Sequence, residues 1–171
     1  PLWNSKGDGI MGWSILNFSG DEIIEIALQM EESGKLFYER AHDLAKEAKL
    51  KDMLAYLATE EEHHIKTFTK LGEQLSRQFV PNERYVGEYG DYVKSLINSH
   101  IFKLSEVEDL VASIKTDHDI VRFAIGFEKD SIVILQEFQN AANKEGAEVL
   151  EKLIQEERNH IKLISTYFKN L

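Results

Sequence analysis

The sequence predicts an all-α fold, namely an antiparallel four-helix bundle with a long crossover between the second and third helices. Three observations lead to this prediction. The 171 residues include only two prolines, so few positions interrupt a helix. Apolar residues recur at steps of three and four along four long segments, which is the spacing of one helix face. The motif L-x-x-E-E-x-x-H occurs at residues 57–64 and again at residues 153–160, so the two halves of the chain repeat one another.

The first half of the repeat predicts a pair of helices. Ser19-Gly20-Asp21-Glu22 has the spacing of a capping box, so the first helix is expected to begin there and to run to about Lys46. The second is expected over about residues 50–77, where an apolar stripe is interrupted midway by Glu61 and His64. Since the connection between the two helices is short, they are expected to be antiparallel.

The segment 79–115 is predicted to be the crossover. It lacks a long periodic stripe, and Pro81-Asn82 marks a turn. Short helices are expected at about 89–99 and 105–114, the second with Ser105 as its cap. A connection of this length inside a compact domain is explained if it runs along the length of the bundle.

The second half of the repeat predicts the remaining two helices. The third helix is expected to begin near Thr116 or Asp117 and to end at about Asn143. The fourth is expected to span about residues 145–169. A short connection again favours an antiparallel pair, so the bundle consists of two copies of one helical hairpin.

Composition and length limit the classes of function that the chain can have. The chain has no cysteine, which excludes disulfides, thiolate catalysis, iron–sulfur clusters and cysteine-type zinc sites. Its net charge of −10 argues against a nucleic-acid surface. No segment approaches the roughly 18 apolar residues of a membrane span. We expect one bundle over residues 19–171, preceded by a poorly ordered leader at 1–18, of which Pro1–Ile10 reads as tag-derived. Because the leader lacks the features of a signal peptide, a cytoplasmic location is expected.

Six polar side chains fall on the predicted inner stripes of the four long helices. A Glu and a His three residues apart lie on the same face of a helix, one turn from each other. The repeat also reaches the first and third helices, where residues 27–31 match residues 124–128 and each copy ends in a Glu. The candidate metal ligands are therefore Glu31, Glu61, His64, Glu128, Glu157 and His160.

These six residues match the ligand pattern of di-iron and di-manganese carboxylate bundles. Four buried carboxylates are too costly without cations, and two divalent ions would balance their four negative charges. Imidazole ligands disfavour Ca²⁺ and Mg²⁺. We expect two iron ions, with manganese or zinc as alternatives in the isolated protein.

Other polar residues near the candidate ligands are weaker candidates for a functional role. Tyr38 lies two turns beyond Glu31, either as a core aromatic with a satisfied hydroxyl, the interpretation we favour, or as a hydrogen-bond donor near the ligands. His42 is about 16 Å from Glu31 along the helix, too far to share its metals. His63 points about 100° away from its neighbour His64. The glutamates that precede the motif ligands are expected to be solvated rather than to orient the site: Glu60 and Glu156.

The two motifs, with Ala27-x-x-x-Glu31 and the following Phe37-Tyr38, resemble the ferritin-like superfamily and most of all the rubrerythrin di-iron domain. This resemblance implies reduction of hydrogen peroxide or dioxygen at a dinuclear iron site, and a homodimer. It also implies an external electron donor such as a rubredoxin, because no cysteine is present to hold a rubredoxin-like centre. Rubrerythrins commonly carry an additional Glu beside the one in the third helix, but here the residues three positions before and after Glu128 are Ile125 and Ser131.

Two alternatives remain open. One is a ferroxidase or iron-binding protein of the bacterioferritin type, which shares the ligand pattern. The other is a non-enzymatic helical bundle whose metals are structural, which predicts bound zinc and no reaction with peroxide.

Overall fold

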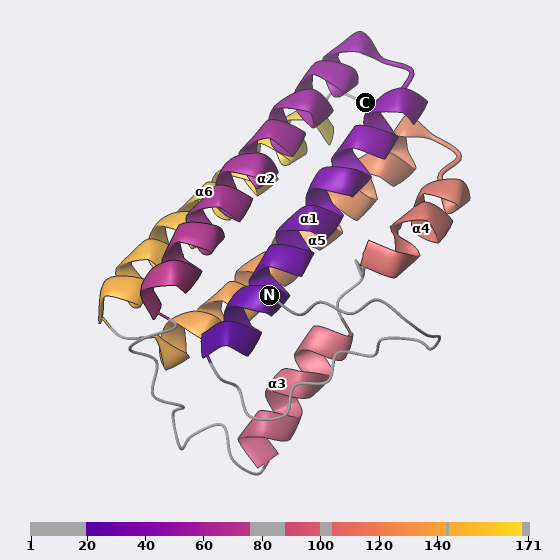
Figure 1. Cartoon of the computed structure of the whole chain (residues 1–171). Helices are drawn as coiled ribbons and strands as arrows, with labels where there is room; N and C mark the ends of the chain where they lie inside the picture. Colours follow the sequence, from indigo (N-terminus) through magenta and orange to yellow (C-terminus); the bar gives the residue numbers. More distant parts are fainter. Residues whose placement is uncertain (1–19, 76–87, 100–103, 143, 169–171) are drawn as a thin grey trace, which may run out of the picture.

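Four long helices form the bundle in the computed structural model, which describes residues 20–75, 88–99, 104–142 and 144–168. They are α1 (Gly20–Leu44), α2 (Ala48–Leu75), α5 (Asp117–Ala141) and α6 (Lys144–Phe168). α1 and α2 form one hairpin and α5 and α6 the other, and the two hairpins pack together (Figure 1). No strand occurs in these described ranges. The predicted all-α bundle is confirmed.

The helix ends agree with the predicted ones to within about two residues wherever the structure describes them. α5 begins with a complete capping box, in which the Thr116 side chain accepts from the Asp119 N–H and the Asp119 carboxylate accepts from the Thr116 N–H. The predicted cap at Ser19 and the leader at 1–18 lie outside the described residues. The division of the chain into leader and bundle therefore stays a prediction.

The crossover lies along the α1 and α5 side of the bundle. It contains α3 (Glu88–Asn98), the 3₁₀ turn η2 (Leu104–Glu106) and α4 (Val107–Ser113). α3 contacts α5, and α4 contacts α1 (Figure 1). The prediction that Ser105 caps a helix is wrong, because Ser105 lies inside η2 and α4 begins after Glu106 without a side-chain cap.

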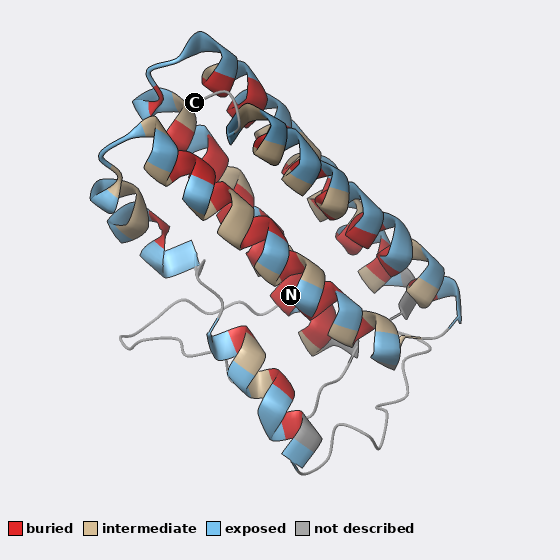
Figure 2. Ribbon diagram, turned by 180° about the vertical axis from the view of Figure 1, so that it is seen from behind, coloured by how far each residue is buried: buried red, intermediate tan, exposed pale blue. Residues whose placement is uncertain are grey.

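The buried residues lie on the faces that the four helices turn towards one another (Figure 2). Most of these residues are apolar, and they form the core. Gly34 marks a close approach of α1 to α5, since a Cβ atom built on it would lie 2.2 Å from Phe127 Cζ. Gly34 follows Glu31 by one turn, and Phe127 directly precedes Glu128. This close approach therefore limits the distance between α1 and α5 beside the candidate ligands Glu31 and Glu128. No helix in the described segments combines the length and the apolar character that a bilayer span requires.

Candidate metal centre

All six candidate ligands lie inside the bundle. The four carboxylates are 0% exposed, and His64 and His160 are 1% and 3% exposed. Charged side chains are almost never buried this completely unless they are paired or bind metal. Each of the four long helices contributes to the cluster, as the repeat predicts.

The ligand atoms of these residues form two groups, and within each group they lie within 4.8 Å of one another. Glu61 and Glu157 belong to both groups, so they lie between the two positions where a metal ion could be held. Each group adds one further Glu and one His from a different pair of helices. The first group is Glu31, Glu61, His64 and Glu157, and the second is Glu61, Glu128, Glu157 and His160.

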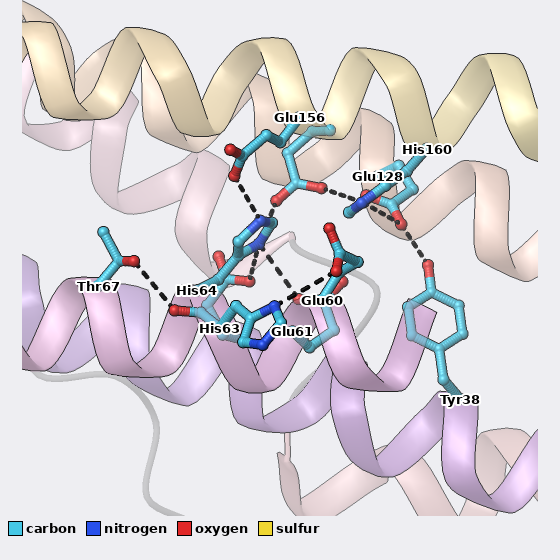
Figure 3. Close-up of polar contacts among 11 residues, drawn as sticks. Tyr38, Glu60, Glu61, His63, His64, Thr67, Glu128, Glu156 and His160 are labelled. Atoms are coloured by element: carbon cyan, nitrogen blue, oxygen red, sulfur yellow. Dashed lines mark hydrogen bonds and ion pairs between the residues drawn. The ribbon is translucent and has the colours of Figure 1, made fainter. Parts of the chain in front are cut away.

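Both imidazoles direct Nδ1 at the carboxylates (Figure 3). His64 Nδ1 lies 3.2 Å from Glu31 Oε2 and 3.0 Å from Glu157 Oε1. His160 Nδ1 lies 2.9 Å from Glu157 Oε2 and 3.5 Å from Glu128 Oε1. The two rings are stacked with centroids 5.6 Å apart, so the two halves of the repeat face each other across the centre.

Several ligand atoms in the centre are buried without a hydrogen-bond partner among the described residues. They include both carboxylate oxygens of Glu61 and one oxygen each of Glu31 and Glu128. Such groups are costly when left unpaired in the protein interior. Unpaired carboxylate oxygens next to imidazole nitrogens are the donor set that binds iron, manganese or zinc, so these residues fit a pair of divalent metal ions.

A family model described as Rubrerythrin matches residues 22–111, which is more than half of the chain. The chain belongs to the rubrerythrin family. The predicted family and its ferritin-like di-iron fold are thus confirmed, and the match includes Glu31, Glu61 and His64. No curated protein and no solved structure matches the chain. The second rubrerythrin-type hairpin, which carries Glu128, Glu157 and His160, is identified by the internal repeat and by its place in the bundle.

Burial sets the protonation of two carboxyls in this rubrerythrin-family site. It raises the pKa of Glu61 well above the usual range, and the negative charge of Glu31 raises it further. Burial likewise raises the pKa of Glu128, where the neighbouring charge is that of Glu157. Both groups therefore hold protons readily when no cation is bound.

The remaining groups form a charged hydrogen-bonded set. Burial acts to raise the pKa of Glu157, but hydrogen bonds from Glu128, His160 and His64 lower it instead. Burial acts to lower the pKa of His160, yet hydrogen bonds to Glu128 and Glu157 raise it to about 10. Burial also acts to lower the pKa of His64, yet hydrogen bonds to Glu156, Glu157 and Glu31 raise it. Without metal, protons occupy the places of the cations, and metal binding must displace them.

The structure agrees with both of the interpretations of Tyr38 given above, core aromatic and hydrogen-bond donor. It is a fully buried core residue, and its hydroxyl donates to Glu128 Oε1 at 2.5 Å (Figure 3). Burial and the charge of Glu128 raise the pKa of Tyr38 well above its usual range, so it stays protonated as a donor. Tyr38 therefore touches a candidate ligand directly.

Glu156 is a functional candidate for which the sequence favoured the wrong one of two interpretations, solvation over orientation of the ligands. It was expected to be solvated, but its Oε2 lies 3.1 Å from His64 Nε2, although half of the side chain is exposed. A carboxylate on the second nitrogen of a metal-binding histidine fixes the ring's orientation and tautomer. The only signal for this contact before the structure was known is the general tendency of metal-binding histidines to pair their second nitrogen with a carboxylate. Its repeat counterpart Glu60 contacts His63 at 3.3 Å instead.

The other histidines near the ligands stay outside both groups. His63 is 61% exposed, and His42 lies beside Asp43 at 3.3 Å on the surface. Ser131, three residues after Glu128, is fully buried. The structure therefore brings together the six predicted ligands and offers no carboxylate at that position.

Proposed function

We propose that this chain is a di-iron oxidoreductase that reduces a peroxide, with hydrogen peroxide as the simplest substrate. The observation that carries the proposal is the pair of ligand groups that share Glu61 and Glu157 and each hold one imidazole. When bound, two iron ions would supply the two electrons that cleavage of an O–O bond requires. Hydrogen peroxide, two electrons and two protons then give two molecules of water.

The geometry supports a definite assignment of ligands. Glu31 and His64 would hold one ion, Glu128 and His160 the other, and Glu61 with Glu157 would be shared between them. Four carboxylates carry four negative charges, which two divalent ions neutralise while both imidazoles remain uncharged. This neutral arrangement is what makes burial of six polar side chains tolerable.

The protein's own residues orient the centre and control its protons. Glu156 holds the His64 ring from outside, so that Nδ1 faces the carboxylates. Tyr38 keeps its proton on the hydroxyl oxygen and donates a hydrogen bond to Glu128. Apolar side chains around the cluster exclude bulk water, which strengthens these interactions.

The proposed electron donor is a separate protein such as a rubredoxin. The 171-residue sequence has no cysteine and so offers no iron–sulfur ligand of its own. The net charge of −10 would favour a donor with a complementary basic surface. The expected homodimer and the cytoplasmic location also stay predictions.

Oxidation of the iron-loaded protein by peroxide tests the proposal. The protein would be loaded anaerobically with Fe²⁺, mixed with one equivalent of hydrogen peroxide, and followed by absorbance in a stopped-flow instrument. We expect rapid oxidation that is faster with peroxide than with air-saturated buffer. Faster reaction with dioxygen, with uptake of further iron, would favour a ferroxidase. Inertness to peroxide would leave a structural metal site.

A further inference from the structure

A surface hollow of about 600 Å³ lies between α2 and α6, beside the metal centre. Tyr56 and Leu163 contribute much of its apolar wall and are 48% and 41% exposed. The crossover helices α3 and α4 contact α5 and α1, on the other side of the bundle (Figure 1). The residues that line the hollow are Asp52, Met53, Tyr56, Asn159, His160 and Leu163.

His160 links this hollow to the metal centre. The same imidazole lines the hollow and lies 2.9 Å from Glu157 Oε2 through Nδ1. The two nitrogens of an imidazole point in different directions, so Nε2 is directed away from that carboxylate. His160 is only 3% exposed, and its Nε2 has no hydrogen-bond partner in the described part of the chain. A buried polar atom beside the hollow is thus left free for a ligand.

In the other half of the repeat, the corresponding nitrogen of His64 already has a hydrogen-bond partner. His64 Nε2 is paired with Glu156 at 3.1 Å. The counterpart of Glu156 near His160 is Glu60, but that carboxylate is held by His63 at 3.3 Å and by the Tyr56 hydroxyl. The two ends of the centre therefore differ, although their metal-ligand residues are the same.

The apolar wall is also particular to the His160 end. In the repeat, the counterpart of Tyr56 is Lys152 and that of Leu163 is Thr67, each 96 residues away. A lysine and a threonine make a poor site for a hydrocarbon group, whereas a tyrosine ring and a leucine make a good one. The candidate ligands are thus the same in both halves, whereas Tyr56 and Leu163 have polar counterparts.

We propose that this hollow binds the apolar part of an organic hydroperoxide and places its peroxide group at His160. The inference rests on the proposed peroxide-reducing function and names a wider substrate class for it. A hollow of about 600 Å³ is far larger than hydrogen peroxide requires, because a water molecule occupies only about 30 Å³. Pockets of this size with apolar walls and a few polar groups bind small organic molecules.

Charge and chemistry both fit a neutral hydroperoxide. Asp52 lines the hollow and the carboxylates of Glu60 and Glu156 lie near its Tyr56, so an anionic ligand is disfavoured. In the reaction the O–O bond takes up two electrons and breaks, and two protons are added. The products are an alcohol and water. The two electrons would come from the pair of iron ions, one from each, and the external donor protein would restore them one at a time.

A binding experiment tests the hollow without any turnover. The zinc-loaded protein, which is diamagnetic and redox-inert, would be titrated with cumyl alcohol, the product expected from cumene hydroperoxide. We expect a saturable shift of the Met53 methyl signal in a ¹³C-methyl NMR spectrum. The Met30 methyl, which is buried in the core and does not line the hollow, serves as the internal control. No saturable Met53 shift, or an equal shift of both signals, would overturn the inference.

A kinetic experiment compares two peroxides on the iron-loaded protein. Leu163→Asp replaces an apolar wall residue, and Val133→Asp is its control because Val133 is equally exposed, at 41%, on α5. We expect the rate ratio of cumene hydroperoxide to hydrogen peroxide to fall about tenfold in Leu163→Asp. The ratio should not change in Val133→Asp.

The outcomes separate the two proposals. Wild-type protein that reacts with hydrogen peroxide but not with cumene hydroperoxide would overturn this inference and leave the proposed function standing. An unchanged ratio in Leu163→Asp would do the same. If neither peroxide oxidises the iron, the proposed function fails, and the substrate assignment fails with it even if cumyl alcohol binds in the hollow.

Discussion

The Tyr38 hydroxyl lies 2.5 Å from Glu128 Oε1, a buried hydrogen bond that joins α1 to α5 inside the metal centre. It has no counterpart in the other half of the repeat, because the position equivalent to Tyr38 is Leu135. Glu128 is therefore held by a tyrosine, whereas its counterpart Glu31 lies against His64. A nearly symmetric set of ligands thus sits in an asymmetric protein environment.

Replacing Tyr38 with Phe removes this donor while keeping the ring. Glu128 then loses a partner that fixes its carboxylate, so metal affinity is expected to fall about tenfold. Anaerobic metal titration measures the effect. Tyr167→Phe is the control, since that hydroxyl bonds Glu47 on the surface at 2.6 Å and touches no candidate ligand. Equal affinities in both variants would show that Tyr38 serves the core alone.

Glu156 is predicted to position His64. Glu156→Ala leaves His64 Nε2 without its carboxylate, and the ring then loses the partner that fixes its orientation. We expect metal affinity at one of the two positions to fall about tenfold, seen as two separated steps in a Co²⁺ titration followed by absorbance. Glu60→Ala is the matched variant from the other half of the repeat and should keep the wild-type curve. Identical curves for the two variants would rule out this role.

Gly34 is predicted to be required for the contact between α1 and α5. Gly34→Ala forces the Phe127 ring to move, since the new Cβ would lie 2.2 Å from Phe127 Cζ. Overpacking of this kind costs about 1–3 kcal/mol, which urea unfolding of the metal-free protein can measure. The cost should largely disappear in the Phe127→Leu background, because the clashing ring is gone. Additive effects of the two substitutions would argue against the clash.

The capping box at the start of α5 predicts a pH-dependent contribution. Hydrogen bonds from the Thr116 hydroxyl and from the Lys115 and Thr116 N–H groups lower the pKa of Asp119 below its usual value of 3.8. A lowered folded-state pKa means that the contribution is fully present above pH 3.8 and is lost as pH falls through the folded-state value. Asp119→Asn should therefore reduce the free energy of unfolding at pH 7 and have little effect near pH 2. Urea unfolding at both pH values measures this, and an equal loss at both would contradict it.

The long helices were predictable because their signal is local. Each has an apolar stripe over more than twenty residues, and no proline lies within any of the four. The buried cluster of six candidate ligands was predictable for a different reason, since the repeat presents the same unusual feature twice, a Glu and a His at core positions. A single E-x-x-H would not have distinguished His64 from the exposed His63.

What the sequence did not predict depends on distances between helices. The contact of Glu156 with His64 crosses from α6 to α2, and no spacing within one helix encodes it. The same is true of the hollow beside His160, which needs side chains of two helices at once. At Ser105 the cap pattern was present, but a 3₁₀ turn took its place.

The number of metal ions bound per chain tests the central claim most directly, that six residues from four helices hold a dinuclear centre. Anaerobic Fe²⁺ titration, with bound iron counted after removal of free metal, would be run on wild type, Glu128→Ala and Glu61→Ala. We expect two tightly bound ions in wild type and loss of one in Glu128→Ala. In Glu61→Ala we expect weaker binding of both ions, because Glu61 belongs to both ligand groups. Two ions bound with unchanged affinity in both variants would contradict it.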